Sequence, residues 1–220
     1  EESLVDARLL AENLDIEFKV IEIEEIVNIF RNTLKESVND ELGQITDENI
    51  QSRVRGNILM ALSNQTGAMV VSTGNKSEMA VGYSTLYGDL AGGFALLKDL
   101  YKTEVYNLAN FRNSISSVIP QNTIDKEPSA ELRPDQFDKD SLPEYELLDE
   151  ILRMYIEEDS SSEKIISKGI DENIVYDVLS KVDRNEYKRK QVAPGVKLTE
   201  KAFGKDRRMP ITNTYIRERG

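Results

Sequence analysis

The string STGNKSE, at residues 72–78, combines hydroxyl, amide and carboxylate side chains directly after a short apolar run. Phosphate is favoured by the backbone N–H groups of a turn that joins a strand to a helix, and by the positive end of that helix. Glu78, one turn into the helix, could hold magnesium or orient a substrate group. The alternative is local structure, in which residues 73–77 cap the helix and Glu78 interacts favourably with its dipole.

Basic residues elsewhere in the chain could meet the same anion. Lys102 begins a predicted helix, where a positive charge is unfavourable unless it meets an anion. Arg53 and Arg55 are two positions apart on another predicted helix and face different sides, so one of them could reach a ligand. The clusters at residues 188–190 and 205–208 could neutralise a diphosphate, although such surface charges are usually solvated.

The composition restricts the chemistry that is available. The 220 residues include no Cys and no His, which excludes thiol catalysis and removes the commonest acid/base group at neutral pH. The remaining groups suit the handling of phosphates with a hard cation such as magnesium. A net charge of −12 argues against nucleic acid as a partner, because phosphate contacts need clustered Lys and Arg.

The sequence also predicts a cytoplasmic protein. It has no run of about 18 apolar residues that could span a membrane, and its first residues do not read as a signal peptide. We therefore expect no membrane partner. The length and the lack of a low-complexity linker predict one domain over residues 1–220.

Hydrophobic spacing predicts the helices and strands that position these groups. In chain order they are a helix over 3–14, a strand over 16–23, a helix over 23–38, a helix that begins at Thr46 or Asp47 and stops at Gly67, and a strand over 68–73. The last of these is an apolar, β-branched run typical of a strand buried on both faces. Ligands in open parallel sheets bind beyond the carboxyl ends of strands, so residues 73–78 are where we first expect a site.

The second half of the chain is predicted to contain a long loop followed by helices. Residues 113–143 are rich in Pro and acidic side chains. A loop of that length in a compact domain is usually functional or disordered. Helical spacing returns over residues 144–192.

Longer strings follow one another from about residue 49 to residue 213: ENIQSRVRGNILM, STGNKSEMAVGYSTLYGDLAGGF, LLKDLYKTEVYNLA, KEPSAELRPDQ, EYKRKQVAPGVKL and RRMPITN. Together they resemble the synthetase domain of NAD synthetases, in particular the bacterial glutamine-dependent type. Tyr187 and Leu86 stand where many ammonia-dependent relatives have His and Lys, which favours the glutamine-dependent branch. The resemblance implies an α/β fold of the adenine nucleotide α-hydrolase-like kind, a Rossmann-like parallel sheet flanked by helices, with a helical C-terminal part.

The resemblance implies a ligase that works in two steps. The nicotinate carboxylate of deamido-NAD attacks the α-phosphate of ATP to give an adenylate and pyrophosphate, and ammonia then displaces AMP to give NAD. Mg²⁺ would offset phosphate charge, and the ammonia would come from glutamine through a glutaminase domain absent here. A homodimer or larger homo-oligomer is also implied. Positioning and electrostatics would supply much of the rate acceleration.

The resemblance also implies binding roles for individual residues, and it assigns no catalytic residue. The residues implied to bind ATP are Thr73, Lys102 and Ser129. The residues implied to bind deamido-NAD are Asn49, Arg53, Glu78, Asp89 and Lys188. Glu78 is in addition the implied metal ligand.

Two elements of the family pattern have no counterpart in this sequence. The pyrophosphate-binding string Ser-Gly-Gly-x-Asp-Ser does not occur, and neither does the glutaminase domain with its cysteine. We therefore expect residues 1–220 to be an N-terminally incomplete synthetase domain that is inactive alone. The alternatives are a noncatalytic fragment or remnant that binds dinucleotide or dimerises, and a different amidating ligase of the same fold. Residues 120–143, which include Ser129, are expected to form an active-site loop that closes over ATP.

Overall fold

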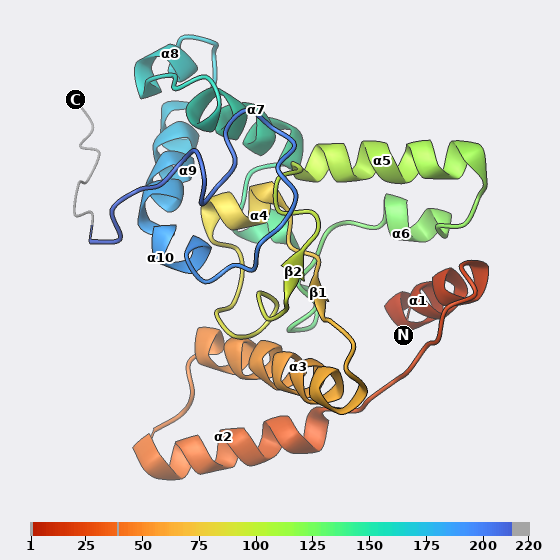
Figure 1. Cartoon of the computed structure of the whole chain (residues 1–220). Coiled ribbons are helices and arrows are strands. Elements are labelled where there is room, and N and C mark those ends of the chain that lie inside the picture. The colour runs from red at the N-terminus through yellow and green to blue at the C-terminus, as the bar shows by residue number, and fades with distance from the viewer. Residues whose placement is uncertain (1, 39, 213–220) are drawn as a thin grey trace.

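Helices dominate the computed structural model, which describes residues 2–38 and 40–212 (Figure 1). The helices are α1 (Glu2–Asn13), α2 (Glu24–Val38), α3 (Gln44–Thr66), α4 (Lys76–Val81), α5 (Lys102–Ile115), α6 (Gln121–Asp125), α7 (Tyr145–Ile156), α8 (Ser162–Ile166), α9 (Glu172–Arg184) and α10 (Glu186–Arg189). A 3₁₀-helix, η1, covers Asp138–Asp140. The strands are β1 (Val71–Ser72) and β2 (Phe94–Ala95). Asn213, the last residue of the resembling strings, lies outside the described residues.

The two strands form a small parallel sheet at the centre of the molecule (Figure 1). Val71 pairs with Phe94 and Ser72 with Ala95, and α4 lies in the crossover between the strands. Such a strand–helix–strand unit is the basic element of a parallel α/β fold. The fold class predicted from the sequence is therefore confirmed, and the turn after β1 lies at the carboxyl end of a parallel strand.

The main hydrophobic core lies among α4, α7, α8 and α9. On α7, Leu148, Ile151 and Leu152 recur at helical spacing and are fully buried. On α9, Val178 and Val182 are likewise fully buried against them. Each such side chain contributes about 1.5–3 kcal/mol on burial. This core fixes α4, and with it one wall of the candidate site.

A second cluster joins α2 to α3, with Val27, Ile50 and Val54 buried between them. Arg31 and Asp47 form an ion pair across the same interface. Helix α3 ends as predicted at Gly67, whose left-handed backbone (φ 73°) lets its N–H bond the Ser63 carbonyl at 2.8 Å.

Three local predictions are wrong. Residues 16–23 have the alternation of a strand but pair with no strand in the described part of the chain, and an unpaired segment cannot form a ladder. Helix α3 begins at Gln44 rather than at Thr46 or Asp47, because Gly43 is its N-cap residue. The predicted loop over 113–143 is interrupted by the end of α5, by α6 and by η1.

None of the helices formed by the described residues has the length and apolar character needed to cross a membrane.

Candidate functional site

A cavity of about 660 Å³ opens beyond the carboxyl end of β1. It is lined by α3, the turn from β1 to α4, residues 82–91, the start of α5, residues 129–141 and Lys188 of α10. The predicted residues that line it are Asn49, Thr73, Glu78, Asp89, Lys102, Ser129 and Lys188. The structure thus brings together side chains that are up to 139 positions apart in the sequence (188 − 49).

The turn between β1 and α4 is organised by a capping box. Asn75 Oδ1 accepts a hydrogen bond from the backbone N–H of Glu78 at 3.0 Å, and Glu78 Oε2 accepts one from the N–H of Asn75 at 3.1 Å. The local interpretation of this string as a helix cap is therefore confirmed. The helix cap and the cavity are compatible, because Thr73 and Glu78 also line the cavity.

Glu78 and Lys102 form an ion pair within the cavity. Glu78 Oε1 lies 3.1 Å from Lys102 Nζ, and both side chains are 20% exposed. Burial alone would lower the pKa of Lys102, but the Glu78 carboxylate outweighs it and raises that pKa above its usual value. The ammonium also lies 5.3 Å from the centre of the Tyr145 ring. Lys102, which begins α5, therefore stays protonated.

The wall of the cavity opposite the α4 turn comes from one face of α3. Asn49, Ser52 and Gly56 follow one another at helical spacing and all line the cavity. Asn49 Oδ1 accepts a hydrogen bond from Thr85 Oγ1 at 2.7 Å, and Ser52 Oγ accepts one from the backbone N–H of Asp89 at 3.2 Å. Asp89 is thereby fixed to α3 as well as to its own turn.

Glycine at position 56 is required by the close approach of α3 to this turn. A Cβ atom there would lie 2.8 Å from the carbonyl oxygen of Tyr87 and 2.9 Å from that of Gly88. Such contacts are too short for any side chain. The small residue lets residues 84–89 lie directly against the helix.

Lys188 reaches the cavity from α10 by way of the end of α4. Its Nζ donates hydrogen bonds to the backbone carbonyls of Gly82 at 2.6 Å and Ser84 at 2.8 Å. Burial lowers the pKa of Lys188, and the charge of Asp89 opposes this. A cation at the last carbonyls of a helix is favourable, so Lys188 holds the turn that carries Thr85 and Asp89.

Ser129 lies in a loop that is closed by its own hydrogen bonds. The backbone N–H of Asp138 donates to the Pro128 carbonyl at 2.9 Å, and Gln136 Oε1 accepts from the N–H of Leu132 at 2.9 Å. Asp138 also accepts from the Tyr145 hydroxyl at 2.7 Å. These bonds attach the loop to α7 and place Ser129 at the cavity.

Arg53 is the exception among the predicted site residues, because it does not line the cavity. Its Nε donates to the Leu86 carbonyl at 3.2 Å on the exposed side of α3, whereas Arg55 lines the cavity. The two arginines do face different sides, but the sequence could not show which of them faces the cavity.

The basic clusters also differ from their predicted role. Arg189 is 6% exposed, and its guanidinium donates to the carbonyls of Ala80 and Val182 at 2.7 and 2.6 Å. Arg207 donates to the Tyr155 carbonyl at 3.2 Å. Neither arginine lines the cavity, whereas Lys188 of the first cluster does, so the structure does not bring these two arginines to the candidate site.

The described residues do not form a metal site by themselves. Among residues 2–38 and 40–212, no group of three or more His, Cys, Asp or Glu side chains is placed to hold a metal ion. Glu78 is one carboxylate, and it is paired with Lys102. Mg²⁺ in nucleotide sites is commonly held by one or two carboxylates together with phosphates, so Glu78 fits that role only jointly with a nucleotide.

Sequence reasoning missed several cavity residues, including Ser52, Gly56 and Thr85. A signal for α3 was present, because Asn49, Ser52 and Gly56 are polar or small at helical spacing within an otherwise mixed helix. Thr85 carried no such signal, since its role depends on the fold of the turn around it.

The fold and the cavity define an α/β protein with a large cavity beyond the carboxyl end of a parallel strand, which is where ligands bind in open parallel sheets. A model of the family described as NAD synthase matches residues 1–192. The chain belongs to the NAD synthase family.

Its relatives include much longer proteins. The glutamine-dependent NAD(+) synthetase of Aquifex aeolicus is 54% identical over 217 residues, which are 99% of this chain and 38% of the relative. The protein of the same description from Thermotoga maritima is also 54% identical, over 98% of this chain and 38% of its own length. The chain therefore spans 38% of the length of these two relatives.

Solved structures agree with the fold. The glutamine-dependent NAD+ synthetase of Acinetobacter baumannii, in complex with ADP, is 48% identical with a TM-score of 0.56, over 96% of this chain and 38% of that one. The NMN synthetase of Francisella tularensis is 27% identical with a TM-score of 0.68, over 90% and 72%. The ammonia-dependent NAD synthetase of Campylobacter jejuni is 29% identical with a TM-score of 0.65, over 86% and 69%.

Proposed function

We propose that this protein contributes the ATP-using site for amidation of deamido-NAD to NAD, with ammonia supplied by glutamine hydrolysis. The observation that carries the proposal is the cavity, where residues from α3, the β1–α4 turn, α5, the 129–141 loop and α10 meet. Membership of the NAD synthase family and a relative solved with ADP support it.

The proposed reaction passes through an adenylate. A carboxylate oxygen of the nicotinate ring attacks the α-phosphorus of ATP, and the bond to the β-phosphate oxygen breaks to release pyrophosphate. Ammonia then attacks the carbonyl carbon, loses a proton, and displaces AMP, which keeps the former carboxylate oxygen. Both steps mainly need reacting groups held in place and negative charge offset.

Lys102 and Glu78 are the charged pair on which this proposal depends. Nucleotide phosphates in the cavity would draw the Lys102 ammonium away from Glu78, to which it is bonded at 3.1 Å. The freed carboxylate would then face magnesium or deamido-NAD. Magnesium, held by Glu78 and the phosphates, would supply further charge neutralisation.

The test follows one oxygen atom in the natural full-length protein. Deamido-NAD labelled with ¹⁸O in its nicotinate carboxylate should yield AMP that carries one label, measured by mass spectrometry. Lys102→Met should lower kcat/KM for ATP by about a hundredfold, the usual effect of removing one preorganised charge donor. Lys164→Met, which removes an exposed lysine of α8 outside the cavity, is the control. NAD formation with unlabelled AMP would exclude the adenylate, and binding without NAD formation would favour a noncatalytic dinucleotide-binding protein.

The same assay tests the choice of substrate and the need for other segments. Because one solved relative is an NMN synthetase, nicotinic acid mononucleotide should be compared with deamido-NAD, and we expect the dinucleotide to react faster.

We also propose that the 220-residue chain alone is inactive, since the Ser-Gly-Gly-x-Asp-Ser string is absent from it. ATP-dependent NAD formation by the purified chain would contradict this.

Further parts of the proposal concern assembly and the loop. We propose a cytoplasmic homodimer or larger homo-oligomer, which light scattering on the full-length protein would test.

The loop over 120–143 is proposed to close over ATP, so ATP and deamido-NAD together should protect this loop from protease. Equal cleavage with and without them would count against closure.

A further inference from the structure

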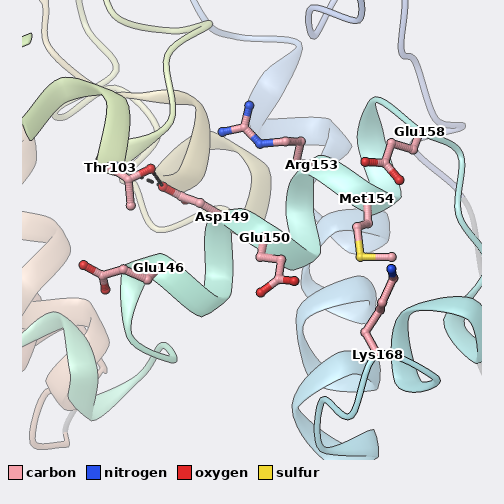
Figure 2. Close-up of a pocket in the computed structure, with 8 residues that line it drawn as sticks. All are labelled: Thr103, Glu146, Asp149, Glu150, Arg153, Met154, Glu158 and Lys168. Carbon is pink, nitrogen blue, oxygen red and sulfur yellow. Dashed lines mark hydrogen bonds between the residues drawn. The ribbon is translucent and has the colours of Figure 1, made fainter. Parts of the chain in front are cut away.

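A buried carboxylate on α7 joins the starts of α4 and α5. Asp149 Oδ1 accepts a hydrogen bond from Ser77 Oγ at 2.5 Å. Asp149 Oδ2 accepts two from Thr103, one from the backbone N–H at 2.9 Å and one from Oγ1 at 2.8 Å (Figure 2). Ser77 Oγ in turn accepts a hydrogen bond from the backbone N–H of Lys102 at 2.9 Å. One side chain is thus bonded to both helices.

The bonded positions are the sequence neighbours of the charged pair in the cavity. Ser77 directly precedes Glu78 in the first turn of α4, and Thr103 directly follows Lys102 in the first turn of α5. The relative placement of the two first turns decides whether the Glu78 carboxylate and the Lys102 ammonium can meet, as they do at 3.1 Å. Asp149 therefore acts on the pair through the backbone on either side.

The same face of α7 supports α5 at the adjacent positions. Tyr145 lies one turn before Asp149, and its ring lies 5.3 Å from the Lys102 ammonium. Arg153 lies one turn after Asp149, and its guanidinium is 3.4 Å from the Glu104 carboxylate. The first residues of α5 are thus contacted in order along α7, as expected for side chains four apart on one helix face.

A carboxylate at position 149 is not explained by packing alone. Asp149 is 2% exposed, and its neighbour Leu148 on α7 is fully buried in the apolar core. Burying a charged group is costly unless it is fully hydrogen-bonded, whereas an apolar side chain would be buried at no such cost. The acceptor bonds to the two helix starts are what this position provides.

We infer that Asp149 is a positioning residue for the proposed nucleotide site, which sets the first turns of α4 and α5 so that Glu78 and Lys102 face one another across the cavity. The inference rests on the proposed function only for the identity of the ligand. Glu150, the next residue on α7, provides a matched control, because it is exposed and points away from Thr103 (Figure 2).

The test compares variants of the full-length protein in steady-state kinetics with ATP. Asp149→Asn keeps the shape but replaces one acceptor oxygen by a donor, and it should lower kcat/KM for ATP at least tenfold. Thr103→Val removes the hydroxyl and should lower it in the same direction, while Thr103→Ser keeps the hydroxyl and should retain activity. Glu150→Gln should stay within twofold of the wild type.

A double-variant comparison separates positioning from general destabilisation. In a Lys102→Met background, Asp149→Asn should have less than a twofold further effect, because the Glu78–Lys102 pair that Asp149 sets face to face no longer exists. An equal fold loss in both backgrounds, or no loss in the wild-type background at temperatures well below Tm, would overturn the inference. If the wild type forms no NAD, the proposed function fails, and the Kd for ATP of the same variants then tests the inference, with unchanged Kd values overturning it.

Discussion

Replacing Lys76 by Met would remove an ammonium group that is fully buried beneath the β1–α4 turn. Its Nζ lies 2.9 Å from Glu157 and 3.0 Å from Asp99, and it donates to Thr199 Oγ1 at 2.6 Å. The side chain of Asp99 is 1% exposed and that of Glu157 is 17% exposed. The variant would leave a carboxylate inside the protein without its cation.

The expected loss of stability is large because of this burial. Breaking a buried pair by removal of one partner costs about 3–5 kcal/mol. Met is close to Lys in volume, so little of the loss comes from a cavity. Asp99 would keep its hydrogen bonds from the backbone N–H groups of Leu198 and Thr199, both at 2.7 Å, which should hold the loss near the lower limit of about 3 kcal/mol.

Urea denaturation followed by circular dichroism would measure the free energy of unfolding. Lys181→Met is the matched control, because Lys181 pairs with Asp177 at 2.6 Å on the surface of α9. A surface pair of this kind contributes about 0–1 kcal/mol. The m-value should be the same for wild type and both variants if only stability changes.

A loss for Lys76→Met no larger than that of the Lys181 control would refute the reasoning. The double variant Lys76→Met with Asp99→Asn gives a second check, since removing the stranded charge should make the combined loss smaller than the sum of the single losses. Simple additivity would show that the two charges do not interact.

The remaining predictions concern a close backbone contact and acid. Gly56→Ala should cost about 1–3 kcal/mol in the same urea titration and weaken binding of deamido-NAD, because its Cβ would lie 2.8 Å from the Tyr87 carbonyl. An unchanged free energy of unfolding would contradict this. Burial would raise the pKa of Asp99, but hydrogen bonds from Thr199, Leu198 and Lys76 hold that pKa below the ordinary 3.8. The ionised Asp99 therefore stabilises the folded protein above pH 3.8, and this contribution is lost as the pH falls through the lowered pKa. The unfolding free energies of wild type and Asp99→Asn should therefore converge in acid, and a constant difference down to about pH 2 would contradict the prediction.

The sequence predicted those helices and helix ends that are determined by residues close together in the chain. The spacing of Leu148, Ile151 and Leu152 predicted α7, and the glycine at position 67 predicted the end of α3, because each signal lies within a few residues of its effect. Residues 16–23 carry the strand pattern as clearly, but a strand also needs a partner, and the pattern does not show one.

In the candidate site, too, the sequence predicted what depends on neighbouring residues and missed what depends on contacts between distant elements. The placement of Thr73 and Glu78 followed from one strand and the helix after it, and the structure puts both at the cavity. The choice between Arg53 and Arg55 depends on how α3 turns toward residues 84–89, which spacing cannot specify. Asp149 gave no signal at all, because its role requires α4, α5 and α7 to meet.

Helix α4 is held at both ends by distant residues. Asp149 bonds its first turn, while Asn185 donates to the Val81 carbonyl at 2.9 Å and Lys188 to that of Gly82 at 2.6 Å. A helix of six residues is far below the length of about 12–15 at which isolated helices become even marginally stable. During synthesis on the ribosome, we therefore expect α4 to form stably only after α7 and α10 have emerged, more than 100 residues after Glu78 was made. We therefore expect the nascent chain to complete this wall of the cavity late, after most of the polypeptide has left the exit tunnel.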